Sequence, residues 1–285
     1  MIGVTAASGN LGRLVIESLL RKVPASEVVA AARNTGKIAG LAAKGVAVRE
    51  ADYSKPDTLA RALAGVDNLL LISGSEVGRR VEQHKNVIAA AQKVGVKVIL
   101  YTSLLHCDSS PLLLRDEHLQ TEAAIRSCGI PFAILRNSWY NENYLNAIGQ
   151  AVKLGVHYGC AGEGRTSAAS RADYAEAAAA VLASKENQAG KTYELGGDEG
   201  FTLAQFAAEI ARQSGKPVRY ENLPESDYKA VLVKAGLPEP VAGFFAATDT
   251  GISKGALYDG SRQLHQLIGR ATTPISATIA KALAA

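Results

Sequence analysis

Cysteine is scarce in this chain. Three cysteines occur among 285 residues, Cys107, Cys128 and Cys160, widely spaced and without a C-x-x-C pair. An odd, dispersed set of thiols argues against a disulfide framework and against a cysteine-rich zinc site, and it is typical of reduced thiols in the cytosol. We therefore expect a cytoplasmic protein with no metal site.

Long apolar runs are missing as well. No run approaches the roughly 18 residues of a membrane span, and no charged segment precedes the apolar start in the manner of a secretory signal. The net charge of +4 comes from scattered basic residues, of which Arg79 and Arg80 form the tightest pair. Nucleic-acid binding usually needs a concentrated basic face. We expect neither a membrane nor a nucleic-acid partner, and the basic surplus suits an anionic small ligand.

Large aromatic side chains are few, with five phenylalanines and one tryptophan against 47% hydrophobic residues overall. Apolar runs alternate instead with segments of helical spacing such as Leu11 to Leu19. The predicted strands are residues 1–5, 27–32, 46–48, 68–72, 97–101 and 132–135. Strands that are nearly continuously apolar, joined by helices, indicate an α/β fold with a Rossmann-type, doubly wound parallel sheet of about six strands.

The alternation changes after Arg136. Glycine-rich pieces and prolines then mix with helical segments, of which Arg171 to Leu182 and Leu203 to Gln213 are the clearest. We predict a nucleotide-binding domain over residues 1–136 and a smaller C-terminal α/β substrate domain over residues 137–285, with some later segments returning to the first sheet. Ligands of such sheets bind at the carboxyl edge of the strands.

A glycine-containing turn follows the first predicted strand. Gly9 and Gly12 stand three apart, and Ala6 occupies the place where a third glycine would complete the pattern. Strand, glycine turn and helix in this order are typical of a pyrophosphate site, because unpaired amides and the helix dipole attract an anion there. Ala6 costs little if its φ is negative, which we expect. A plain tight turn is the alternative.

The end of the second strand carries Arg33 and no acidic residue nearby. An acid at this place selects NADH, whereas an arginine can pair with the 2′-phosphate of NADPH. The sequence therefore favours NADPH, with weaker binding of NADH. Asp52, after the third strand, either caps a helix or reaches the adenine.

The Tyr-x-x-x-Lys pair of ordinary short-chain dehydrogenases is absent, since no tyrosine has a lysine four residues later. His118 and Glu122 occupy the corresponding place, counted on from Ser103. Their i, i+4 spacing places both on one helix face. They form either a catalytic pair or a solvated helical pair.

Several stretches together resemble a known family. They include VTAASGNLG, AARN, LLLISGSEVGRRVEQHKNVI, YTSLLH, DEHLQTEAAIRSCGIPF, ILRNSWYNENYL, SRADYAEAAAAVL and SKGALYD. The chain resembles, over almost its full length, the NmrA-like branch of atypical short-chain dehydrogenase/reductases, and within it the type 2 NAD(P)H:quinone oxidoreductases and triphenylmethane reductases. It departs from the family pattern at Ala6, where the family has glycine, and at Ser8, where threonine is more usual.

The resemblance implies a cofactor site in three segments. The pyrophosphate would lie on Ala6, Ala7, Ser8, Gly9, Asn10 and Leu11, with Arg33 at the adenosine phosphate. Ser73, Gly74 and Ser75 would pass beside the ribose. The nicotinamide end would be enclosed by Asn137, Ser138, Trp139, Tyr140, Asn141 and Glu142.

The resemblance also implies two-electron reduction of a small quinone, and of dyes as well. The cofactor supplies the hydride, so the protein chiefly orients the reactants. A donor near the developing oxyanion would still help, and our candidates are, in order, Asn143, Tyr140, His118 and His106. Trp139 and Tyr140 would stack on a flat ring or belong to the core.

The main alternative is a non-catalytic NADP(H)-sensing regulator of the NmrA type. A sugar-nucleotide epimerase or hydroxysteroid dehydrogenase is disfavoured by the missing Tyr-x-x-x-Lys pair. The sequence leaves open whether the chain is a monomer or a homodimer.

Overall fold

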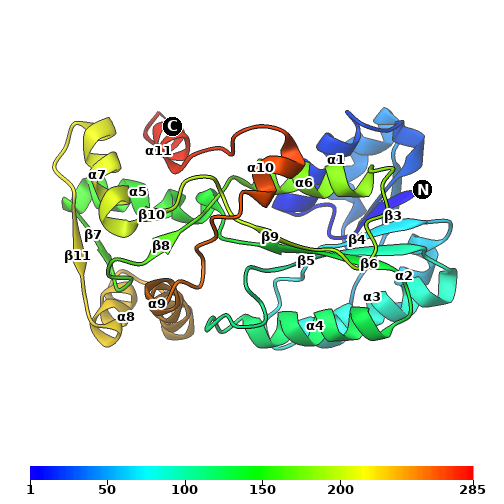
Figure 1. The fold of residues 1–285 in the computed structure, drawn as a ribbon, viewed down its shortest axis with the longest axis horizontal. Coiled ribbons are helices and arrows are strands. Elements are labelled where there is room, and N and C mark those ends of the chain that lie inside the picture. The colour runs from blue at the N-terminus through cyan, green and yellow to red at the C-terminus, as the bar shows by residue number, and fades with distance from the viewer. Residues whose placement is uncertain (285) are drawn as a thin grey trace. The chain divides into compact units, whose positions relative to one another are not determined.

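The apolar runs form one seven-stranded sheet in the order β3-β2-β1-β4-β5-β6-β9 (Figure 1). The computed structural model describes residues 1–284. The strands are β1 (Ile2–Val4), β2 (Val28–Ala32), β3 (Ala47–Glu50), β4 (Asn68–Leu71), β5 (Val98–Leu104), β6 (Phe132–Asn137) and β9 (Thr192–Leu195). The first six lie where the sequence predicts them and pair in parallel. The predicted doubly wound α/β fold is confirmed, with one strand more than expected.

Helices cover both faces of this sheet (Figure 1). They are α1 (Asn10–Leu19) and α6 (Arg171–Leu182) on one face, and α2 (Pro56–Leu63), α3 (Arg80–Val94) and α4 (Arg115–Ser127) on the other. Short 3-10 segments span Ala25–Glu27 and Thr35–Lys44. Strands buried on both faces must be apolar throughout, and all five residues of β2 are buried.

The chain divides into two compact units. The first comprises residues 1–107, 116–137 and 171–193, and the second comprises residues 108–115, 138–170 and 194–285. The segment 171–193 thus returns to the first unit after a long excursion. The functional assignment of the second unit as a substrate domain stays a prediction.

The second unit contains two small sheets and six helices among its described residues. Strand β7 (Val156–Gly159) pairs in parallel with β11 (Arg219–Asn222), and β8 (Arg165–Thr166) pairs antiparallel with β10 (Phe201–Thr202). The helices are α5 (Leu145–Leu154), α7 (Leu203–Ser214), α8 (Glu225–Lys234), α9 (Glu239–Ser253), α10 (Gln263–Ile268) and α11 (Ile275–Leu283), and a 3-10 turn spans Asn141–Tyr144. A capping box between Thr202 and Gln205 begins α7.

The remaining observations on the fold concern cysteines, membrane-spanning helices and metal ligands. All three cysteines are free thiols. None of the helices between residues 1 and 284 has both the length and the apolar character needed to traverse a bilayer. The same residues contain no group of three or more potential metal ligands.

Candidate functional site

The turn between β1 and α1 leaves the start of a helix open to an anion. Gly9 is the N-cap residue of α1 and has no side chain to bond the first amides, and no acidic residue lies in the first turn. The first amides of a helix have no partner within the helix, and the helix dipole adds partial positive charge there. Gly9 and Asn10 are exposed. The predicted pyrophosphate turn is therefore locally suited to a phosphate.

Gly12 sets how closely α1 approaches this turn. A Cβ atom at Gly12 would lie 2.4 Å from the carbonyl oxygen of Ala6 and 2.9 Å from Cα of Ala7. Both neighbours are backbone atoms, which cannot rotate away as a side chain can. The helix can pack against the turn at this distance only because residue 12 is glycine.

Ala6 adopts a left-handed conformation, with φ of +47°. The expectation of a negative φ was wrong. The amide of Gly9 donates to the Ala6 carbonyl (2.9 Å), and the amide of Ala7 donates to Ala31 of β2 (3.0 Å). These bonds hold the turn that begins at residue 6, the position at which the resemblance leads us to expect glycine. An alanine in this region costs about 1–2 kcal/mol relative to its preferred conformations.

A buried hydroxyl pair ties the turn to its neighbours. Thr5 Oγ1 donates to the carbonyl of Leu70 (3.0 Å) and accepts from the amide of Ile72 (3.1 Å), so β1 and the end of β4 are cross-linked. The hydroxyl of Tyr53 bonds to Thr5 Oγ1 and to the Ile72 carbonyl. Burial raises the pKa of Tyr53, so the hydroxyl stays protonated and donates. These bonds fix Thr5, the residue before Ala6, against the end of β4.

Arg33 follows β2, as predicted, and its side chain is largely exposed. Its Nη1 donates to Oε1 of Glu76 at 2.8 Å, and the two side chains are 65% and 34% exposed. Glu76 lies in the loop after β4, forty-three positions along the chain. Because Glu76 is so distant from Arg33 along the chain, the residues around Arg33 in the sequence do not reveal this partner.

Asp52 forms a local turn. Its Oδ1 accepts from the amide of Ser54 at 2.9 Å, and its amide donates to the hydroxyl of Thr58 at 2.9 Å. These bonds organise the loop that leads into α2, where Lys55 is the N-cap residue. Asp52 therefore does not cap α2, contrary to one of the two predicted roles, and a contact with the adenine stays a prediction.

The loop containing Ser73, Gly74 and Ser75 is fixed by hydrogen bonds to its backbone. The amide of Ser73 donates to Thr102 Oγ1 (2.9 Å), the amide of Gly74 donates to His84 Nε2 (3.0 Å), and Arg80 Nε donates to the Gly74 carbonyl (2.8 Å). Arg80 and His84 are four residues apart on α3, so they lie on one face of the helix. This spacing is visible in the sequence, but neither residue was predicted to belong to the site. Burial, with the charge of Arg80, lowers the pKa of His84 to about 3, so His84 is a neutral acceptor here.

His118 lies on the inner face of α4 and is bonded to a tyrosine. Its Nδ1 is 2.7 Å from the hydroxyl of Tyr101 on β5. Burial lowers the pKa of His118 to about 3, and the charge of Arg80 adds to this shift. A neutral, buried imidazole with this pKa does not donate a proton by titration near neutrality. The role of His118 as a general acid is therefore not supported.

Glu122 belongs to a separate buried cluster. Its carboxylate accepts two bonds from Arg136, at 2.9 Å from Nε and 2.7 Å from Nη2, and one from Ser103 Oγ at 2.6 Å. Glu122 is 1% exposed and Arg136 is 4% exposed. A buried carboxylate needs such partners because removing either one would leave an uncompensated charge. Both alternatives for His118 and Glu122 were wrong, since the two side chains are neither paired with each other nor solvated.

The predicted nicotinamide segment begins in the first unit and continues in the second. Asn137 ends β6, and its buried Oδ1 has no hydrogen-bond partner. In the second unit, Ser138 Oγ donates to the Leu257 carbonyl (3.0 Å) and Asn141 Nδ2 donates to the Thr273 carbonyl (2.9 Å), while Asn141 Oδ1 is also buried without a partner. An unsatisfied buried amide oxygen is rare. Asn137 thus offers a polar atom to a ligand at the carboxyl end of a strand.

The remaining candidates are divided between the units. His106 follows β5 in the first unit, is half-buried and has a φ of +51°. Trp139, Tyr140, Glu142 and Asn143 lie in the second unit; the first three are half-buried and Asn143 is exposed. The amide of Asn143 donates to the Tyr140 carbonyl at 3.0 Å. Their roles stay predictions.

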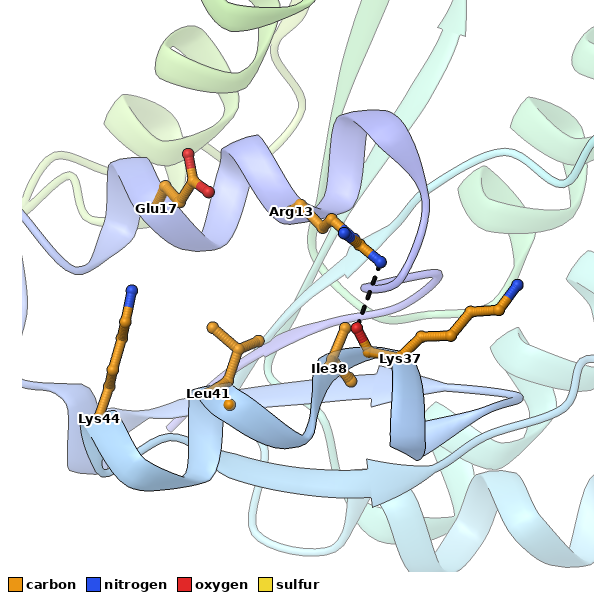
Figure 2. A pocket seen from close by; sticks show the side chains of 7 residues that line it. Arg13, Glu17, Lys37, Ile38, Leu41 and Lys44 are labelled. Atoms are coloured by element: carbon orange, nitrogen blue, oxygen red, sulfur yellow. Dashed lines mark hydrogen bonds between the residues drawn. The ribbon is translucent and has the colours of Figure 1, made fainter.

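A groove beside the glycine turn was not predicted. It has a volume of about 250 Å³ and lies between α1 and the segment Thr35–Lys44 (Figure 2). Arg13 joins its two walls, because Nε donates to the Ser8 carbonyl and Nη2 to the Lys37 carbonyl, both at 3.2 Å. Arg13, Lys37 and Lys44 give its lining a positive balance over Glu17. Basic side chains therefore lie on this flank of the predicted phosphate turn.

Comparison with known proteins places the chain in one family. A model of the NmrA-like family matches residues 1–279. The chain is 52% identical over 279 residues to quinone oxidoreductase 2 of Escherichia coli, which covers 98% of this chain and 97% of that protein. The structure of the E. coli NADPH-dependent quinone oxidoreductase QOR2 with NADPH gives a TM-score of 0.96 at 52% identity over 99% of each chain. Triphenylmethane reductase of Citrobacter sp., complexed with NADP(H), gives 0.95 at 39% identity over 99% of this chain and 100% of that chain.

Proposed function

The chain belongs to the NmrA-like family, and from this premise we propose that it is an NADPH-dependent oxidoreductase that reduces quinones by two electrons to hydroquinones. The observation that carries the proposal is the 52% identity, across almost the full length of both chains, to a quinone oxidoreductase. The likeness to a triphenylmethane reductase at 39% identity extends the proposed substrates to dyes.

The residues of the first unit fit the phosphates of NADPH. The uncapped start of α1, with Gly9 as N-cap and no acid in the first turn, offers amides to the pyrophosphate. Arg33 is the side chain for the 2′-phosphate, since its planar guanidinium matches two phosphate oxygens. NADH lacks this phosphate and is therefore expected to bind more weakly.

The nicotinamide end is assigned to residues 137–142. The support is the buried, unpartnered Oδ1 of Asn137 at the carboxyl end of β6, because ligands of such sheets bind at this edge. Bound NADPH supplies the hydride. The chain's own part is to hold the acceptor ring in line, to exclude water and to stabilise the negative oxygen that develops on the quinone.

Proton delivery to the reduced quinone does not use His118. Its pKa of about 3 leaves it neutral, and its Nδ1 is already engaged by Tyr101. Burial also raises the pKa of Tyr101, which holds its own proton tightly. The hydroquinone anion left by hydride transfer needs one proton, which water can supply. Asn143 and Tyr140 remain the proposed donors to the developing oxyanion.

The proposal also includes the cellular location and the oligomeric state. We expect the protein in the cytoplasm, which the three free cysteines support. A homodimer is also proposed, and sedimentation of the purified chain distinguishes it from a monomer. The competing idea of a non-catalytic sensor is not favoured, because the full-length relatives named above are reductases.

The test is steady-state oxidation of NADPH with benzoquinones, naphthoquinones and triphenylmethane dyes. We expect multiple turnovers with at least one small quinone. Asn143→Ala should lower kcat and kcat/KM together and leave NADPH affinity unchanged, as expected for a contact made in the transition state. Asn146→Ala, an exposed asparagine on α5, is the matched control. A protein that binds NADPH but oxidises none of it with any acceptor would instead be a sensor.

A further inference from the structure

The proposed 2′-phosphate residue already has an anionic partner from the same chain. Arg33 Nη1 donates to Glu76 Oε1 at 2.8 Å, and Glu76 comes from the loop that follows β4. A carboxylate and a phosphate bind the same edge of a guanidinium group, because both accept hydrogen bonds from its paired N–H groups. Any anion that accepts a hydrogen bond from Arg33 Nη1 therefore either displaces Glu76 Oε1 or lies close to it.

Glu76 is held in place independently of Arg33. Its Oε2 accepts from Gln83 Nε2 at 2.9 Å and from Arg79 Nη1 at 3.4 Å. The loop around it is fixed as well, because the amide of Gly78 donates to Glu117 Oε1 at 2.8 Å. The carboxylate is thus built into the site and does not reach Arg33 by chance rotation of a free side chain.

The ion pair between Arg33 and Glu76 can also break without leaving a buried charge unpaired. Glu76 would keep Gln83 and Arg79 as donors, and Arg33 is largely solvent-exposed. Breaking a hydrogen bond is costly mainly when a buried partner is left unsatisfied. Exchange of Glu76 for a phosphate on Arg33 is therefore feasible, but the retained carboxylate still repels the dianionic phosphate beside it.

We propose that Glu76 is a specificity-determining residue that competes with the 2′-phosphate for Arg33 and so limits the preference for NADPH over NADH. The inference rests on the proposed function, because it takes Arg33 as the 2′-phosphate residue. NADH has no phosphate at this position and does not have to displace Glu76. The acid penalises only the phosphorylated cofactor.

The test uses fragments of the cofactor, so that catalysis is not involved. Adenosine 2′,5′-bisphosphate carries the 2′-phosphate and adenosine 5′-monophosphate lacks it. We expect Glu76→Gln, which removes the charge and keeps the shape, to tighten binding of the bisphosphate by about fivefold, equivalent to about 1 kcal/mol. Binding of the monophosphate should not change. Titration calorimetry at low ionic strength measures both.

The matched control is Glu82→Gln. Glu82 is an exposed acid in the first turn of α3, and its substitution makes the same change in net charge. It should leave the ratio of the two affinities unchanged. In an Arg33→Gln background, Glu76→Gln should lose its selective effect, since contacting residues are not additive.

The outcomes separate this inference from the function on which it rests. If wild type binds the bisphosphate and Glu76→Gln binds it equally or more weakly, the role of Glu76 is wrong and the cofactor site stands. An equal change for both nucleotides also overturns the inference, because it would report a disturbed loop. If wild type binds the bisphosphate no better than the monophosphate and Glu76→Gln does not change this, Arg33 is not the 2′-phosphate residue, and the inference fails together with that assignment while quinone reduction is still tested by turnover.

Discussion

Ala6 combines an unfavourable conformation with an intact helix start. Its φ of +47° is a region that glycine occupies freely. The N-cap residue that follows, Gly9, has ordinary extended angles of −76° and 169°, so the strain does not spread into the amides of α1. The turn is therefore strained at one residue and undamaged where an anion would bind.

Ala6→Gly should stabilise the protein. Relief of about 1–2 kcal/mol of left-handed strain exceeds the roughly 0.4–1 kcal/mol that glycine costs through the freer unfolded chain. We expect NADPH affinity to stay within about threefold, since the first amides of α1 are already in place. Paired denaturation curves and NADPH titrations check this. A fall in stability would mean that residue 6 is not strained in solution.

His118 shows how far burial changes a residue that looks catalytic. With a pKa of about 3, it carries no charge at neutral pH. His118→Gln should therefore change kcat by less than about threefold and leave the pH profile above about pH 5 without a new or lost ionisation. The measurement is kcat with NADPH and one benzoquinone across that range. A loss of several hundredfold would show that His118 acts in the reaction.

Among the elements, α1 depends on one close contact with the turn. Gly12→Ala would place a Cβ 2.4 Å from the Ala6 carbonyl oxygen, so the helix must move. We expect destabilisation of about 1–3 kcal/mol and more than tenfold weaker NADPH binding.

Gly9→Ala is the matched control for that substitution. Its Cβ would be 3.2 Å from the same oxygen, and its φ of −76° suits alanine. It should be clearly the milder of the two in both denaturation and NADPH titration. Equal effects of the two substitutions would mean that helix packing is not the cause.

The elements also show what the sequence could and could not predict. Strands β2 and β4 were found because a short, continuous apolar run between turns is typical of a strand covered on both faces. The edge strand β9 was missed, since three of its four residues are only partly buried and carry no such run. The pairing of Arg33 with Glu76 depends on parallel strands meeting at one edge, which sequence spacing does not reveal. The same limit applies to Glu122, whose partners come from β5 and β6.

Two buried histidines and one buried carboxyl group respond to pH in opposite directions. In the first unit, His84 and His118 have pKa values lowered to about 3. They stabilise the folded protein above the histidine pKa of the unfolded chain, which is about 6.5, and this stabilisation is lost as the pH falls toward 3. In the second unit, desolvation raises the pKa of Asp249 to about 6. Protonated Asp249 stabilises the folded protein below the aspartate pKa of the unfolded chain, which is about 3.8, and this stabilisation is lost as the pH rises through 6.

Asp249→Asn isolates the second of these effects. The asparagine oxygen still accepts from the amide of Cys160, which lies 3.0 Å from Asp249 Oδ2. The variant should gain stability relative to wild type as the pH rises from about 4 to 7, by about 1–3 kcal/mol. Urea denaturation of both proteins at several pH values checks this. A difference that does not vary with pH would mean that Asp249 titrates normally.

The central claim is that this fold binds NADPH through Arg33 and passes its hydride to a quinone. The most direct measurement is kcat/KM for NADPH and for NADH with one benzoquinone, in wild type and in Arg33→Asp, with Arg61→Asp on the exposed side of α2 as the charge-matched control. We predict that wild type and the control prefer NADPH, and that Arg33→Asp prefers NADH because its carboxylate repels the phosphate and accepts from the ribose hydroxyls. An unchanged ratio in Arg33→Asp, or no quinone-dependent oxidation of either cofactor by wild type, would contradict the account.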